Sequence, residues 1–166
     1  MKNIFNSDKN SPCFFINLVL KFLQKNLKMI SNKTEIRVRY ADTDQMQFVY
    51  NGKYLEYFEV GRTEMMRAYG LTYFKMEEEG FQLPLLEAHV KYISHALYDD
   101  LIEVEAFVVS YPEFRIRIDY KVVRKSTQEL IAEGYTEHVF IKKDSKKPVR
   151  PPKFFADVLK PFYTEN

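Results

Sequence analysis

The sequence has little of what disulfide-bonded, metal-dependent and membrane-spanning proteins need. Cys13 is the only cysteine, so neither a disulfide framework nor a cysteine-based zinc site is expected. Its 3 histidines lack metal-ligand spacing, and no glycine-rich phosphate loop or nucleophilic serine motif occurs. No apolar run approaches the roughly 20 residues of a spanning helix. We therefore expect no metal, no cofactor, no stable membrane insertion and a cytoplasmic location.

The residues that are present describe one compact domain. A chain of 166 residues suits a single domain, and 46% hydrophobic residues, with 14 Phe and 12 Tyr, can bury a core. The 25 basic and 23 acidic residues nearly balance, giving a net charge of +2. That balance argues against a nucleic-acid binder, which usually has a pronounced basic face.

Residues 1–28 differ from the rest of the chain. Asn, Lys, Phe, Ile and Leu fill 20 of these 28 positions, and Met29 follows directly. Three interpretations are open: a start assigned upstream of the true one, a short amphipathic helix, or a signal or anchor segment. We predict an N-terminal extension over residues 1–30 and a folded domain over 31–166.

Hydrophobic periodicity predicts a strand and then a long helix. Residues 35–40 alternate charged and apolar side chains, as a half-buried strand does. From Asn51 the apolar spacing becomes helical and ends at Gly70, a favourable residue just past a helix C-terminus. Gly61 lies inside this apolar stripe, where close approach to another backbone would compensate its cost of roughly 1 kcal/mol relative to Ala.

The second half of the chain reads as sheet. We expect a helical turn over 72–79, strands over 82–96, 101–111, 114–122 and 130–142, and a C-terminal helix that Pro161 ends. Tight connections at 111–114 and 125–128 favour an antiparallel meander. A single long helix and an antiparallel sheet must bury their apolar faces against each other, which predicts an α+β fold with the sheet wrapped around the helix.

The loop before the long helix holds the candidate chemistry. Asp42 and Asp44 lie within ten residues of the expected helix start. A helix N-terminus can hold an anion or polarise a carbonyl oxygen, and a nearby carboxylate could attack that carbonyl or activate water. An acyl ester or thioester would meet both groups. Turn chemistry, with the side chains bonding local N–H groups, is the simpler interpretation of such a pair.

Three segments carry a resemblance to a known family. The pattern Y-x-D-T-D…V-Y-N-x-x-Y-L-x-Y-F-E-x-x-R runs from Tyr40 to Arg62, followed by VKYISHALYDDLIEVEAFV at 90–108 and IAEGYTEHVFIKKDSKKPVRPP at 131–152. Together they resemble the 4-hydroxybenzoyl-CoA thioesterase-like family of hotdog-fold acyl-CoA thioesterases. The resemblance implies a hotdog fold, a long central helix wrapped by an antiparallel sheet. It also implies a homo-oligomer, dimer or tetramer, with sheets paired edge to edge and sites at the subunit interface.

The resemblance also assigns roles to residues. The family's catalytic carboxylate maps onto Asp44, as nucleophile or general base, and Asp42 is left to loop structure. Many relatives carry His where this chain has Asn51, and glycine-rich sequence where it has residues 45–48. Further candidates for substrate binding are Tyr50, Asn51, Gly52, Tyr54 and Glu59. Basic residues on one strand face and near 142–150 could meet CoA phosphates, although solvated surface is the simpler interpretation.

The expected function is hydrolysis of an acyl-CoA thioester to free acid and CoA. Alternatives are a thioesterase acting on acyl carrier protein and a non-catalytic module that binds acyl thioesters. A hotdog dehydratase would need a catalytic histidine on or near the helix, and none occurs between residues 40 and 88.

Overall fold

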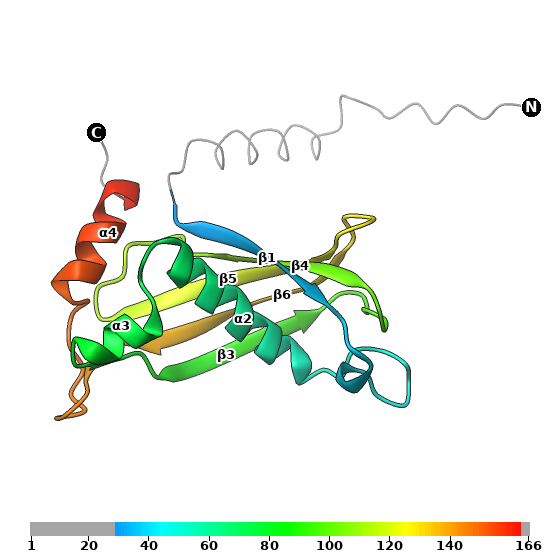
Figure 1. The fold of residues 1–166 in the computed structure, drawn as a ribbon, viewed down its shortest axis with the longest axis horizontal. Coiled ribbons are helices and arrows are strands. Elements are labelled where there is room, and N and C mark those ends of the chain that lie inside the picture. The colour runs from blue at the N-terminus through cyan, green and yellow to red at the C-terminus, as the bar shows by residue number, and fades with distance from the viewer. Residues whose placement is uncertain (1–28, 164–166) are drawn as a thin grey trace, which may run out of the picture.

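The computed structural model describes residues 29–163, so the alternatives for residues 1–28 lie outside the described part of the chain. A single layer of sheet carries one long helix on its concave face, and the shorter helices gather at one end (Figure 1). The loop that precedes the long helix lies at the opposite end. This is the α+β arrangement that the sequence predicts. In residues 29–163 no helix is long and apolar enough to cross a membrane.

The sheet is antiparallel throughout and has the strand order β1-β4-β5-β6-β3. Its strands are Ser31–Arg37 (β1), Leu85–Tyr92 (β3), Leu101–Phe107 (β4), Arg115–Arg124 (β5) and Leu130–Val139 (β6). Strands β4, β5 and β6 form the predicted meander, whereas β3 crosses to the far edge and, within residues 29–163, pairs only with β6. A two-stranded ribbon of Phe81–Gln82 (β2) and Ile141–Lys142 (β7) adds to one end.

The long helix α2 spans Lys53–Ala68 and buries its apolar stripe on the sheet. Phe58 stacks on Tyr120 of β5, with ring centroids 4.2 Å apart and planes 4° apart. A Cβ added to Gly61 would lie 2.8 Å from Val104 Cγ1, so the helix approaches β4 as closely as the glycine allows. The close contact at this glycine is with the side chains of Val104 and Ala106, and not with another backbone as expected.

Polar groups in the core are satisfied by one another. His138 is 1% exposed, and its ring nitrogens lie 3.2 Å from Leu83 O and 3.0 Å from Thr136 Oγ1. Thr136 Oγ1 in turn lies 2.7 Å from Tyr120 Oη. Burial lowers the pKa of His138 to about 4. The histidine is therefore neutral at ordinary pH and ties β6 to the chain before β3.

Several predicted elements differ from the structure. The strand expected over 130–142 ends at Val139, and Ile141–Lys142 pairs with β2 as β7. The strand expected over 82–96 breaks at Leu83 and Pro84 into β2 and β3, since proline cannot donate a ladder hydrogen bond. The C-terminal helix α4, Lys153–Tyr163, continues through Pro161, so the expected stop there was wrong. The final turn is held by tertiary contacts: Tyr163 Oη donates to Val108 O at 2.6 Å, and Phe162 packs edge-on against Tyr69.

Candidate functional site

The loop between β1 and α2 is built around the buried carboxylate of Asp42, which is 1% exposed. The Arg39 guanidinium donates two hydrogen bonds to this carboxylate, from Nη2 to Oδ1 at 2.8 Å and from Nε to Oδ2 at 3.1 Å. The Arg39 N–H and the Tyr57 hydroxyl also donate to Oδ2, at 3.1 and 3.2 Å. The Arg39 guanidinium lowers the pKa of Asp42 despite burial. These contacts fit the loop-structure role expected for Asp42.

Asp44 lies two residues later in a different environment. Its N–H donates to Phe48 O at 2.9 Å, and its Oδ1 accepts the Met46 N–H at 2.8 Å, which closes a tight turn. Gln47 takes a positive φ of 65° to complete that turn. The Asp44 side chain is exposed, and its Oδ2 has no hydrogen-bond partner among the described residues. One carboxylate oxygen is therefore free to meet a ligand.

Asp44 lines a hollow of about 420 Å³ at this end of the molecule. Three segments meet there: the turn after Asp42, the first residues before and in α2, and the end of β3 with the loop after it. The lining residues are Asp44, Met46, Phe48, Val49, Tyr50, Asn51, Tyr54, Tyr92, Ser94 and His95. Asp44 is the only carboxylate among them, and none is Lys or Arg.

The start of α2 forms one wall of the hollow. Tyr92 Oη donates to Asn51 O at 2.9 Å, which ties the end of β3 to the helix. Asn51 Oδ1 accepts the Gly52 N–H at 3.0 Å, while Gly52 occupies the position before the helix without a side-chain cap. The Asn51 N–H has no acceptor within residues 29–163. This backbone donor lies near the positive end of the α2 dipole, in a residue that lines the same hollow as Asp44.

The structure brings some of the expected site residues together and leaves others apart. Tyr50, Asn51 and Tyr54 line the hollow with Asp44, although Tyr54 is 2% exposed and mainly packs against Tyr57 and Tyr92. Gly52 and Glu59 are not among the lining residues. Glu59 lies further along α2, exposed, with its Oε2 3.4 Å from Arg62 Nη2.

Sequence reasoning did not single out the wall formed by Phe48, Tyr92, Ser94 and His95. Phe48 bridges to Leu97, and Val49 N donates to Ala96 O at 2.9 Å, so the loop after β3 docks onto the Asp44 turn. Residues about 50 positions apart meet because β3 crosses the sheet before this loop returns. The sequence shows aromatic and polar residues at 92–95, but only the fold reveals that they lie beside the Asp44 turn.

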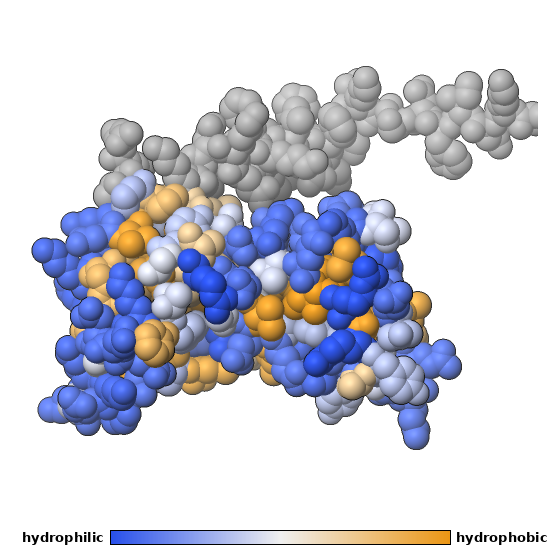
Figure 2. All heavy atoms as spheres, viewed as in Figure 1, coloured by the Kyte–Doolittle hydropathy of each residue, from blue (hydrophilic) through white to orange (hydrophobic). Residues whose placement is uncertain are grey.

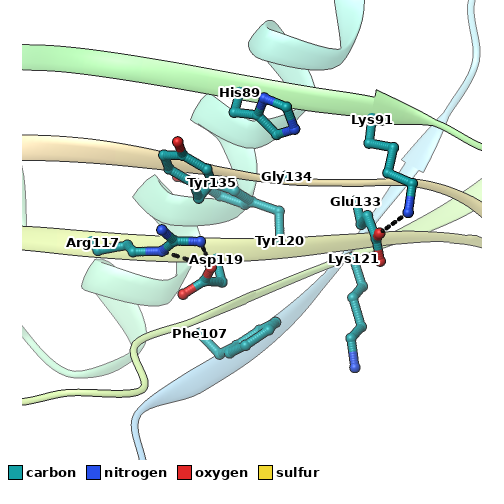
Figure 3. A pocket seen from close by; sticks show the side chains of 10 residues that line it. All are labelled: His89, Lys91, Phe107, Arg117, Asp119, Tyr120, Lys121, Glu133, Gly134 and Tyr135. Atoms are coloured by element: carbon teal, nitrogen blue, oxygen red, sulfur yellow. Dashed lines mark hydrogen bonds and ion pairs between the residues drawn. The ribbon is translucent and has the colours of Figure 1, made fainter.

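A second hollow, of about 340 Å³, lies on the face of the sheet away from α2 (Figure 3). Four of its charged groups form two ion pairs: Arg117 donates to Asp119 Oδ1 at 2.9 and 3.0 Å, and Lys91 donates to Glu133 at 2.9 Å. Lys121 lies over the Phe107 ring instead. Arg117 also covers the Tyr135 ring at 3.7 Å. Both carboxylates of this hollow are therefore ion-paired, Asp119 with Arg117 along β5 and Glu133 with Lys91 across the β3–β6 pair.

The basic residues considered for CoA phosphates are spread over other parts of the molecule. Arg115 pairs with Glu137 at 2.6 Å on the same outer face as Arg117. Lys142 covers the Phe81 ring, and Lys146 donates to Gln82 at 2.7 Å, both at the end opposite the Asp44 hollow (Figure 1). In the described residues no group of three or more His, Cys, Asp or Glu is placed to hold a metal ion.

Known proteins resemble this chain in sequence and in fold. A family model described as the thioesterase-like superfamily matches residues 38–159. A Bacillus subtilis (strain 168) protein named as a candidate acyl-CoA thioesterase, YneP, is 33% identical over 76% of this chain and 91% of its own length.

Solved structures show the same fold. A DHNA-CoA thioesterase from Staphylococcus aureus superposes with a TM-score of 0.72 and 35% identity, covering 78% of this chain and 86% of that one. A 4-hydroxybenzoyl CoA thioesterase, solved as a mutant with 4-hydroxybenzoyl CoA, superposes with a TM-score of 0.71 over 78% of this chain and 99% of that one. At 16% identity this second likeness concerns the hotdog fold alone.

Proposed function

Given that the chain belongs to the thioesterase-like superfamily, we propose that it is an acyl-CoA thioesterase in which Asp44 is the catalytic carboxylate. The reaction converts an acyl-CoA and water into a free acid and CoA. One observation carries the assignment of the residue: Asp44 is the only carboxylate lining the hollow at the start of α2, and one of its oxygens is free.

The hollow supplies the two kinds of group that thioester hydrolysis needs. The Asn51 N–H, near the positive end of the helix dipole, can donate to the thioester carbonyl oxygen and stabilise the negative charge that develops there. The Asp44 carboxylate then faces the carbonyl carbon. Tyr50, Tyr54 and Tyr92 surround the acyl or pantetheine portion with ring surface.

Two mechanisms are compatible with this arrangement. As a general base, Asp44 takes a proton from water while the water oxygen bonds to the carbonyl carbon and the C–S bond breaks. As a nucleophile, Asp44 bonds to the carbonyl carbon and expels CoA thiolate, and water then hydrolyses the resulting anhydride. Both return the free carboxylate and give the same products.

A homo-oligomer forms part of the proposal. Strand β3 is an edge strand, and apolar side chains remain exposed along it and along α2, where Figure 2 shows apolar patches interrupting the hydrophilic surface. Edge-to-edge pairing of two copies through β3 would cover these side chains and bring a second chain against the open hollow. Glu59, which lies outside the hollow of one chain, could contact substrate in such an assembly.

The direct test is release of free thiol from a panel of acyl-CoAs that vary in chain length and aromaticity. We expect turnover by the natural chain and a fall in kcat of at least about 100-fold in Asp44→Asn. Asp119→Asn is the matched control, because Asp119 lines the other hollow and is bonded to Arg117. Absence of turnover with every acyl-CoA, or full activity in a folded Asp44→Asn variant, would refute the proposal.

The same panel separates the alternative functions. A strong preference for the acyl group on acyl carrier protein over the same group on CoA would identify a carrier-protein thioesterase. Saturable binding of acyl-CoA without thiol release would identify a non-catalytic binding module.

A further inference from the structure

Among the side chains that line the hollow, His95 has the only imidazole, the group that proteins use most often as a general acid or base. The other protic side chains are hydroxyls and an amide. Desolvation raises the pKa of Tyr54 and of Tyr92, so these hydroxyls hold their protons more tightly. Ser94 Oγ already donates to Glu129, at 2.5 Å. Since no Lys or Arg lines the hollow, His95 is also its only potential cation.

The backbone of His95 is fixed by a network of charged groups. Arg124 Nη2 donates to His95 O at 2.7 Å. Arg124 is itself held by Asp100, at 3.1 Å, and by Glu129. Asp100 also accepts the Leu97 N–H at 2.9 Å. The loop that carries the histidine is therefore braced against β5 and is not a freely moving surface loop.

The ring of His95 is directed onto the Asp44 turn. It packs against Phe48 with ring centroids 4.3 Å apart and planes tilted by 35°. The carbonyl of Phe48 accepts the Asp44 N–H at 2.9 Å, so one residue links the histidine ring to the carboxylate loop. Neither His95 ring nitrogen has a hydrogen-bond partner among residues 29–163. The ring is thus held in place while its nitrogens stay open to a ligand.

We propose that His95 is the general acid that protonates the departing sulfur, an inference that rests on the proposed thioesterase function. Its imidazolium N–H gives its proton to the sulfur as the C–S bond breaks, so that CoA leaves as a thiol. Water adds to the acyl carbon, and Asp44 takes the water proton. The carboxylic acid form of Asp44 and the neutral imidazole then exchange protons with solvent, which restores the starting state. A carboxylate and an imidazole thereby divide base and acid between them.

Leaving-group dependence provides the test. The His95→Phe variant keeps a ring against Phe48 but loses the transferable proton, and His95→Gln keeps a polar N–H that cannot be transferred. We compare kcat/KM for two thioesters of one acyl group, made with N-acetylcysteamine and with 4-nitrothiophenol. The second thiol is far more acidic and leaves well as an anion. We expect both variants to lose roughly 100-fold with the alkyl thioester and less than about threefold with the aryl thioester.

His89→Phe is the matched control. His89 is also an exposed histidine stacked on a ring, Tyr135, with centroids 5.4 Å apart, but it lies in the outer hollow of the sheet. It should retain the wild-type rates with both thioesters. Equal losses with both thioesters in folded His95 variants, or no loss at all, would overturn the acid role while leaving Asp44-dependent turnover intact. If the natural chain hydrolyses neither these thioesters nor any acyl-CoA, the proposed function itself fails.

Discussion

Asp42 and Asp44 are separated by one residue, yet their side chains have opposite surroundings. Asp42 is buried among Arg39, Tyr57 and a backbone N–H, whereas Asp44 is exposed with a free oxygen. A carboxylate that is fully bonded inside the protein stabilises the loop but cannot approach a substrate. A carboxylate with one oxygen bonded locally is oriented and still available. The difference in burial and hydrogen bonding therefore suits Asp42 to stabilising the loop and Asp44 to meeting a substrate.

The first prediction at the residue scale concerns Asp42→Asn. The amide retains one acceptor but places an NH₂ group against donors, so we expect roughly 2–3 kcal/mol less free energy of unfolding, as for lost hydrogen bonds to a buried charge. Because the pKa of Asp42 is lowered in the folded state, its stabilisation is present above the unfolded-state pKa and is lost as pH falls through the folded pKa. Denaturant unfolding between pH 3 and 7 should show a flatter acid dependence in the variant.

Asp44→Asn is the control for that measurement. Because Asp44 lies in an exposed turn, this substitution should lower the free energy of unfolding far less than Asp42→Asn does. The two substitutions are expected to separate, with Asp42→Asn affecting mainly stability and Asp44→Asn mainly turnover. Equal loss of stability in both variants would contradict the structural division between them.

Individual residues differ in how far the sequence could predict them. The resemblance pointed to Asp44 because the family motif that contains it is a short, continuous stretch of sequence. The sequence around His95 gave no sign of a role in the site. A histidine where a strand passes into a loop is usually an ordinary exposed side chain. Its place beside Asp44 depends on β3 pairing with β6 at the sheet edge and on the loop after β3 docking at Phe48. Such long-range pairings leave no periodic trace in a single sequence.

Secondary-structure elements were predictable where one period ran uninterrupted. The 3.6-residue stripe predicted α2, and alternation predicted β5 and β6 to within a few residues. One error came from a proline inside an apolar run, and another came where tertiary contacts outweighed local preference. Pro84 splits the long strand, while Pro161 is tolerated in the last turn of α4 because Phe162 and Tyr163 are held by packing and by a hydrogen bond to Val108.

The contact between α2 and β4 can be tested by a substitution at Gly61. Gly61→Ala adds a methyl group 2.8 Å from Val104 Cγ1, which is buried and must shift. Helix propensity alone would favour alanine by about 1 kcal/mol, but overpacking costs roughly 1–3 kcal/mol. We therefore expect a lower melting temperature in Gly61→Ala.

A double-mutant cycle with Val104→Ala isolates this contact. Removing the valine methyl groups makes room for the new one, so the double variant should be more stable than the sum of the two single changes predicts. Additive changes, or a higher melting temperature in Gly61→Ala, would show that α2 and β4 are not as tightly apposed as the structure places them.

Two sheet edges, β1 and β3, are unpaired in the described residues, and the β3 edge borders the Asp44 hollow. Strand β3 pairs on one side only, and Leu85, Leu86, Tyr92 and Ile93 on or next to it are between 47% and 51% exposed. An unpaired strand edge bearing apolar side chains readily pairs with another chain. Tyr92 also lines the Asp44 hollow, so the uncovered edge and the candidate site are continuous. Self-association at β3 would therefore complete the walls of the site.

Self-association through β3 can be tested by placing a charge on this edge. Leu86→Lys places a charge on the β3 edge, and its repulsion with a second copy should shift the protein toward monomer. Sedimentation velocity would measure this shift, and free-thiol release would show a parallel loss of turnover because the hollow loses its second wall. Phe74→Lys is the matched control, since Phe74 is 70% exposed but lies on helix α3 (Tyr73–Glu78) and not on the β3 edge. A monomeric Leu86→Lys variant with full activity would show that one chain forms the complete site.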